Sequence, residues 1–198
     1  MERSHVKPID AAGFEAKFRL NIDPWNYRLS PFEAFKRHML LRACGDRMYG
    51  RGLELGCAIG ETSHHLAPRC LRLLAVDSSP TAIAEARRKY GDHPRLSFDE
   101  ARLPEAMPRG PFDLIVASEI GYYLPPQGLT ALLRAIAREL APSGRVVLLH
   151  HLSNFDDAAQ LPFLAQRRMV DFLKQGMSQV FRQRHRCFEA VAFRKARR

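Results

Sequence analysis

The chain has 198 residues, of which 46% are hydrophobic and 26% are charged. This composition is ordinary for a globular protein and argues against disordered, collagen-like and coiled-coil classes. Domains commonly hold about 150 residues, so we expect a single domain over residues 1–198. No apolar run approaches the ~18 residues of a membrane-spanning helix, and residues 1–10 lack the apolar stretch of a secretory signal. These features predict a cytoplasmic protein that does not span a membrane.

The positive charge of the chain is concentrated at one end. The formal net charge is +10, and residues 167–198 carry ten basic and two acidic side chains. Such a segment can bind nucleic acid, but its aromatic residues recur at core-like spacings, so a solvated face of the fold is the favoured interpretation. The four cysteines form no C-x-x-C pair, which argues against zinc and redox chemistry. We expect no metal site.

Strand-sized apolar runs alternate with segments of helical length along the chain. The expected strands are residues 52–55, 72–76, 95–98, 113–117 and 145–149. The expected helices are residues 31–44, 61–66, 80–90, 128–140 and about 156–175. This alternation predicts an α/β fold with a doubly wound, mostly parallel sheet that is covered on both faces. Two last strands, residues 179–182 and 186–194, have no helix between them and must therefore pair antiparallel.

The sharpest local motif is Leu-Glu-Leu-Gly-Cys-Ala-Ile-Gly at residues 53–60, a strand that ends in Gly-x-x-x-Gly and runs into a helix. Glycine lets the backbone turn tightly and approach a ligand. Asp77 ends the next strand, where a carboxylate can accept both hydroxyls of a ribose. The middle glycine of the G-x-G-x-x-G motif of dinucleotide-binding folds is missing here. Ala58 occupies a position that is often glycine in another family. The loop and Asp77 together indicate a nucleoside-containing cofactor.

Taken in order, these motifs resemble the class I S-adenosylmethionine-dependent methyltransferases. Phe-Asp-Leu-Ile-Val at residues 112–116 resembles the fourth strand of that family, and Leu-Ala-Pro-Ser-Gly-Arg at 140–145 resembles the turn before the fifth. The resemblance implies a seven-stranded Rossmann-like fold and S-adenosylmethionine as cofactor, with S-adenosylhomocysteine as product. Arg102 either stacks on the adenine or points to solvent. The cofactor-binding residues that the resemblance implies are Trp25, Glu54, Gly56, Cys57, Ala58, Gly60, Asp77, Ser78, Arg102, Leu103, Ser118 and Tyr123.

Two further segments narrow the resemblance. Asp-Pro-Trp at residues 23–25 with Ser-Pro-Phe-Glu at 30–33 and Lys36, and Ser-Glu-Ile-Gly-Tyr-Tyr-Leu at 118–124, resemble the nodulation protein S group, whose members N-methylate amino sugars of oligosaccharide signals. This implies methyl transfer to a small polar acceptor, most readily the nitrogen of an amino sugar or similar amine. A small-molecule O-methyltransferase is the alternative.

Two other function classes are disfavoured. An NAD-dependent oxidoreductase would need the complete glycine motif, which this chain does not have. Its all-parallel sheet would also have no antiparallel strand pair at the end. An RNA-binding methyltransferase could use the basic end of the chain. However, Ser-Glu-Ile-Gly at residues 118–121 differs from the Asn/Asp-Pro-Pro-Tyr motif of many enzymes that methylate nucleic acids. We expect a small-molecule acceptor and a monomer or homodimer.

An amine acceptor must present a lone pair, and a nearby base can take its proton. Glu119 follows the fourth strand, at the edge where open α/β sheets bind ligands. It is the first candidate to hold the nucleophile, and a carboxylate bonded to backbone beside the cofactor is the equal alternative. Tyr122 could cover the pocket, orient the acceptor or pack in a helix start, whereas Tyr123 is expected to face the cofactor.

His150 and His151 end the fifth strand, so their side chains face opposite ways and only one can point at the site. Either imidazole is a candidate base because it titrates near neutral pH, and a structural role is the alternative for each. Residues 1–50 are expected to form a helical lid segment. Trp25 then closes the site or pins this segment to the core.

Overall fold

The structure, a computed structural model, describes residues 8–197. The expectations about residues 1–7, namely the missing signal sequence and the start of the lid segment, lie outside the described residues. One sheet holds the strands β1 (Tyr49–Leu55), β2 (Cys70–Asp77), β3 (Leu96–Glu100), β4 (Phe112–Ser118), β5 (Leu140–His151), β6 (Met177–Arg184) and β7 (Phe188–Lys195). The helices are α1 (Ala11–Leu20), α2 (Pro31–Cys44), α3 (Glu61–Leu66), α4 (Pro80–Tyr90), α5 (Pro126–Glu139) and α6 (Pro162–Lys174).

The strands lie in the order β3-β2-β1-β4-β5-β7-β6. β1 to β5 pair in parallel, and β7 runs antiparallel to both β5 and β6. This confirms the predicted fold class, a doubly wound and mostly parallel seven-stranded sheet with a C-terminal antiparallel pair. The order of strands reverses between β1 and β4, so the carboxyl ends of these two strands form the switch point where ligands of such sheets bind.

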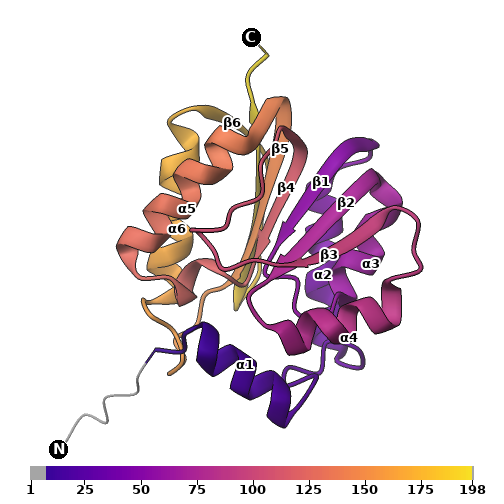
Figure 1. Ribbon diagram of the computed structural model, residues 1–198. Helices are drawn as coiled ribbons and strands as arrows, with labels where there is room; N and C mark the ends of the chain where they lie inside the picture. Colours follow the sequence, from indigo (N-terminus) through magenta and orange to yellow (C-terminus); the bar gives the residue numbers. More distant parts are fainter. Residues whose placement is uncertain (1–7, 198) are drawn as a thin grey trace, which may run out of the picture.

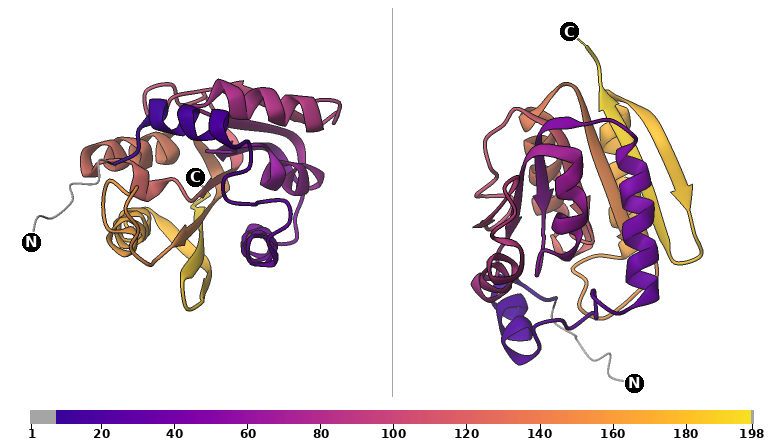
Figure 2. Two further views of the ribbon diagram at one scale, coloured as in Figure 1. Left: turned by 90° about the horizontal axis from the view of Figure 1, so that it is seen from below. Right: turned by 90° about the vertical axis from the view of Figure 1, so that its right-hand side faces the viewer.

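Helices cover both faces of the sheet, as Figures 1 and 2 show. On one face α2, α3 and α4 bury side chains such as Leu40, Leu66 and Ile83 against the sheet. On the other face α5 and α6 bury Leu132, Met169 and their neighbours. The central strands are apolar on both sides because each face contacts a helix layer, and residues 114–117 of β4 are fully buried.

Serine and proline mark the start of two helices. The side chains of Ser30 and Ser79 accept the backbone N–H of Glu33 and Ala82, and a proline follows each cap at the first helical position. This is the arrangement that leaves the fewest helix N–H groups unpaired. Helix α6 begins at Pro162, later than the predicted residue 156, because residues 156–161 form a loop. In this loop the N–H groups of Ala159 and Gln160 bond to the carbonyl of Tyr122.

The sequence predicted a helical segment within residues 1–50 but gave no bounds for α1. Asp10 caps it by accepting the N–H of Gly13 at 2.9 Å, and Phe18 anchors it in a small apolar cluster with Ile59 and Ala82. Figure 1 shows α1 lying across the end of the sheet that is opposite the C-terminus, and the view from below in Figure 2 shows it running beside α4. The helix therefore lies over the carboxyl ends of the parallel strands.

Candidate functional site

A cavity of about 910 Å³ lies at the carboxyl ends of the parallel strands. Its walls come from the loops after β1 to β5, and its roof comes from α1 and the segment between α1 and α2. The roof is aromatic: the rings of Phe14 and Tyr123 meet edge to face at 4.7 Å, and Trp25 lies between Phe18 and Tyr27. Of the predicted cofactor-binding residues, all except Gly60 line this cavity.

The glycine loop shapes one wall of the cavity. Gly56 has a φ of 73° and Ala58 one of 48°, and the N–H groups of Gly56 and Cys57 both bond to the carbonyl of Val76. Gly60, at φ 79°, caps α3 instead of lining the cavity, and a Cβ there would lie 2.9 Å from the ring of Phe98. Gly60 is therefore required by helix packing rather than by contact with a ligand.

Asp77 is fixed at the end of β2 by backbone groups. Its carboxylate accepts the N–H of Ala58 at 2.9 Å and that of Ser79 at 3.0 Å. Burial raises the pKa of Asp77, while these hydrogen bonds oppose the shift. The carboxylate is therefore held rigidly between the glycine loop and the cavity that it lines.

Glu54 lines the same cavity and carries an unusual buried oxygen. The residue is 3% exposed, and its Oε2 has no hydrogen-bond partner among the described residues. Burial raises the pKa of Glu54 to about 7, the neighbouring hydroxyl of Ser63 opposes this shift, and the charge of Asp77 adds to it. A buried carboxylate oxygen without a protein partner is costly unless a ligand supplies a donor. The α-ammonium of S-adenosylmethionine is such a donor, so this wall fits the implied cofactor.

The far side of the cavity suits an adenine ring. Ala101, Leu103 and Pro104 contribute apolar surface beside Ser78. Arg102 lines this side of the cavity and is also exposed. Its position is therefore compatible with both predicted orientations, stacking on the adenine and pointing to solvent.

Three charged side chains meet at the other end of the cavity. Lys36 Nζ lies 2.9 Å from Glu33 Oε1 and 2.9 Å from Glu119 Oε1, and all three side chains are less than a fifth exposed. The other oxygen of Glu119 accepts the backbone N–H of His151 at 3.1 Å and the hydroxyl of Tyr122. Although burial opposes it, the charge of Lys36 together with these hydrogen bonds lowers the pKa of Glu119. These contacts favour the ionised form of Glu119.

The two adjacent histidines have different environments. His151 lines the cavity, whereas His150 is fully buried and does not. His150 Nε2 accepts the N–H of Gly121 at 3.0 Å, so Nδ1 carries the proton and donates to Gln166 Oε1 at 2.8 Å. Burial lowers the pKa of His150 to about 4. His150 is therefore a neutral structural residue that is not placed to accept a proton from a substrate.

The hydrogen bonds of His150 continue towards the C-terminal strand pair. Gln166 Nε2 donates to Glu189 Oε2 at 3.3 Å, and Arg182 Nε donates to Glu189 Oε1 at 2.9 Å. This chain joins the loop after β4, which carries Glu119, to β6 and β7. It also gives Arg182, one of the basic residues near the C-terminus, a structural partner.

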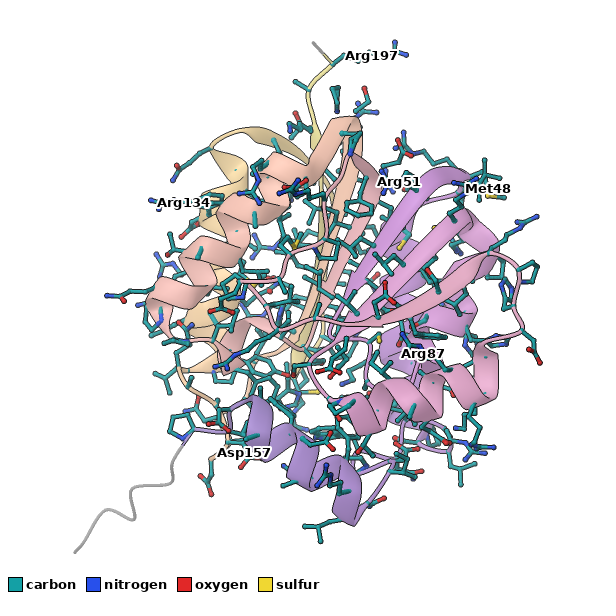
Figure 3. All side chains as sticks on the ribbon, in the orientation of Figure 1. Met48, Arg51, Arg87, Arg134, Asp157 and Arg197 are labelled. Atoms are coloured by element: carbon teal, nitrogen blue, oxygen red, sulfur yellow. The ribbon has the colours of Figure 1, made fainter. Side chains whose placement is uncertain are left out.

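Contacts of α1 that the sequence did not indicate hold the roof in place. Glu15 accepts the hydroxyls of Ser79 and Thr81, each at 2.6 Å, which ties the helix to the start of α4. Lys17 Nζ pairs with Asp157 Oδ2 at 2.5 Å on the opposite side. Figure 3 shows Asp157 beside α1. These partners are distant in sequence, so no local pattern could have revealed them.

Arg37 is a further cavity residue that was missed. It lies one position after Lys36 on α2, and its side chain is 11% exposed. Its guanidinium donates to the carbonyl of Tyr27 at 3.4 Å and lies 4.0 Å from Glu61. A buried guanidinium on the wall of a cavity is suited to bind a carboxylate.

Within residues 8–197, no helix combines the length and apolarity needed to cross a bilayer. The same residues contain no group of three or more His, Cys, Asp or Glu side chains that could hold a metal ion.

Comparison with known proteins identifies the family. The model of the nodulation protein S (NodS) family matches residues 16–155. The chain belongs to the nodulation protein S family. This confirms the resemblance predicted from the segments around Trp25 and Glu119.

Two relatives are similar over part of their length. A nodulation protein S from Rhizobium tropici is 37% identical over 131 residues, which are 63% of this chain and 53% of that protein. One from Sinorhizobium fredii is 33% identical over 129 residues, 63% of this chain and 59% of that protein. The matches thus span a little over half the length of these relatives.

A solved member of the family has the same fold. The N-methyltransferase NodS from Bradyrhizobium japonicum WM9, in complex with S-adenosyl-L-homocysteine, superposes with a TM-score of 0.77 and 24% identity. The match covers 91% of this chain and 97% of that chain. The two proteins therefore share one fold over nearly the whole length of both chains.

Proposed function

We propose that this NodS protein transfers the methyl group of S-adenosylmethionine to the nitrogen of a small amine, of which an amino sugar is the favoured example. The observation that carries the proposal is the position of Glu54 and Asp77 on one cavity wall in a chain of this family. A buried carboxylate, Glu54, and a half-buried one, Asp77, match the two ends of a ligand that carries both a ribose and an amino acid.

The residues present divide the cofactor between them. Asp77 would bind the ribose hydroxyls, and the carboxylate of Glu54 would accept a hydrogen bond from the α-ammonium. Arg37, which contacts the carbonyl of Tyr27 and lies 4.0 Å from Glu61, would bind the α-carboxylate. Ala101, Leu103 and Ser78 surround the adenine. When bound, the sulfonium supplies an electrophilic methyl group.

The charges beyond the glycine loop support an amine as the acceptor. Glu33 and Glu119 line this end of the cavity on either side of the ammonium of Lys36, whereas Asp157 is paired with Lys17. A cationic acceptor is attracted by this excess of carboxylates, whereas an anionic acceptor would be repelled. A neutral hydroxyl acceptor would gain little from it, which places the O-methyltransferase alternative second.

The roof of the cavity serves as a lid. Phe14, Trp25, Tyr27 and Tyr123 cover the site with aromatic rings, which excludes water and strengthens the electrostatic interactions inside. Opening requires the contacts of Glu15 and Lys17 to break. We assign to Tyr122 and His151 the role of orienting Glu119 and the acceptor, since both bond to Glu119.

Calorimetric titration with S-adenosylhomocysteine, and with NAD in parallel, tests the cofactor assignment. Binding of S-adenosylhomocysteine without a response to NAD is expected. Mass spectrometry of glucosamine and deacetylated chitin oligosaccharides, incubated with S-adenosylmethionine and the protein, then tests the acceptor. The absence of S-adenosylhomocysteine binding would refute the proposal, and methylation of a hydroxyl in place of the amine would refute its acceptor.

A further inference from the structure

We propose that Glu33, rather than Glu119, takes the proton that the acceptor amine must lose before methyl transfer. The inference rests on the proposed function, because it applies only to an amine acceptor. At neutral pH such an amine arrives largely as an ammonium ion, which has no lone pair to attack the methyl carbon. A base at the acceptor end of the cavity can receive this proton.

Glu119 is poorly placed for this step because three hydrogen bonds already hold its carboxylate in the ionised form. One oxygen accepts from Lys36 Nζ at 2.9 Å. The other accepts from the N–H of His151 at 3.1 Å and from the hydroxyl of Tyr122. Glu119 also has a positive φ of 55°, a conformation that its fixed hydrogen bonds help to hold. Protonating it would break this network.

Glu33 contacts the same ammonium group of Lys36 as Glu119 does. It occupies the first turn of α2, where a glutamate commonly reaches back to the backbone N–H of the N-cap residue. That N–H belongs to Ser30 and already bonds to the carbonyl of Asn26 at 3.0 Å. The side chain of Glu33 instead lines the cavity, and its Oε1 lies 2.9 Å from Lys36 Nζ. Glu119 differs, because Lys36, the N–H of His151 and the hydroxyl of Tyr122 all donate to its carboxylate.

The charged groups around Glu33 set its affinity for protons. Lys36 and Arg37 lie on the same helix, Glu119 faces it from the end of β4, and Tyr27 comes from the segment before α2. Burial raises the pKa of Glu33, and the charge of Glu119 adds to this effect, which outweighs the opposing charge of Lys36. The pKa of Glu119 moves in the opposite direction. Two neighbouring carboxylates whose pKa values are pushed apart divide into one that accepts a proton and one that stays ionised.

Lys36 separates the two roles. Burial acts against its charge, but the two carboxylates raise its pKa, so it stays an ammonium ion. Its ammonium group lies between the two carboxylates, 2.9 Å from Glu33 Oε1 and 2.9 Å from Glu119 Oε1, and favours the ionised form of Glu119. In this arrangement Lys36 is a positioning residue, and Glu33 is the group that touches the acceptor.

The step balances without another reactant. The ammonium form of the acceptor gives one proton to the carboxylate of Glu33, which becomes a carboxylic acid. The neutral nitrogen attacks the methyl carbon, a C–N bond forms, and the C–S bond breaks with its electron pair left on sulfur. The product leaves as a methylated ammonium ion, and Glu33 returns its proton to solvent.

The test compares Glu33→Gln and Glu119→Gln with Glu100→Gln, a control at an exposed carboxylate outside the cavity. Glucosamine is the acceptor probe. We expect Glu33→Gln to bind S-adenosylhomocysteine within about 2-fold of wild type and to lose about 100-fold in kcat at pH 7, the range of general base catalysis. The rate should recover as pH rises, because free amine then becomes abundant in solution. An unchanged pH profile in Glu33→Gln would overturn the proposal.

A second readout does not depend on turnover. Carbon-13 NMR of the side-chain carboxylates, in the complex with S-adenosylhomocysteine, follows the titration of each group, and the resonances missing from Glu33→Gln and Glu119→Gln provide the assignment. Glu33 should titrate at higher pH than Glu119, and the reverse order would overturn the proposal for Glu33 alone. Failure of the wild-type protein to bind S-adenosylhomocysteine would instead refute the proposed function.

Discussion

Replacing Glu54 with Gln should make the cofactor-free protein more stable while weakening its hold on the cofactor. Burial raises the pKa of Glu54 from 4.5 to about 7. Since each pKa unit corresponds to about 1.4 kcal/mol, the ionised carboxylate destabilises the folded protein by on the order of 3 kcal/mol at high pH. The folded pKa lies above the unfolded one, so this penalty is absent below about pH 4.5, grows between the two values and is complete above about pH 7.

Urea unfolding without cofactor measures the effect at pH 5 and pH 8. Glu54→Gln should raise the free energy of unfolding by about 1 to 3 kcal/mol at pH 8, and the difference should fall to below about 1 kcal/mol at pH 5. The lower bound allows for the cost of a buried amide group. A difference that is the same at both pH values would refute the reasoning, because it would have no link to ionisation.

The same variant should bind S-adenosylhomocysteine about 10- to 100-fold more weakly at pH 8, since a hydrogen bond between two charged groups is lost. Calorimetry measures this affinity, and Glu100→Gln serves again as the matched control outside the cavity. Wild-type affinity in Glu54→Gln would mean that Glu54 Oε2 does not face the α-ammonium.

Three further variants test other parts of the site. Asp77→Ala should weaken S-adenosylhomocysteine binding by about 100-fold in calorimetry without unfolding the protein, and near-normal affinity would remove Asp77 from the ribose site. Gln166→Leu leaves the Nδ1–H of His150 unpaired in the core, so it should lower the free energy of unfolding in urea by about 1 to 3 kcal/mol; an unchanged midpoint would contradict this. Glu15→Ala should speed dissociation of S-adenosylhomocysteine several-fold, followed in stopped flow by the fluorescence of Trp25, and an unchanged rate would show that the lid opens elsewhere.

Local features of the sequence determined much of the fold. A serine followed by proline starts α2 and α4 because its side chain caps the helix and proline loses no hydrogen bond there. Continuous apolar runs indicated strands covered on both faces, as the burial of β4 confirms. The family resemblance was equally local, since it depended on the glycine loop and on short segments around Trp25 and Glu119.

Only the tertiary structure decided how distant residues meet. The insertion of β7 between β5 and β6 depends on which edge of the sheet offers unpaired backbone groups, and adjacent positions in the sequence carry no such information. The periodicity of β5 predicts that His150 and His151 face opposite ways, but the packing of α6 decides that His150 is the buried one. The ion pairs of Lys36 likewise join α2 to the end of β4. Side chains far apart in the chain acquire their pKa values and partners only when packing excludes water around them, and for this reason the acceptor end of the cavity could not be derived from the sequence.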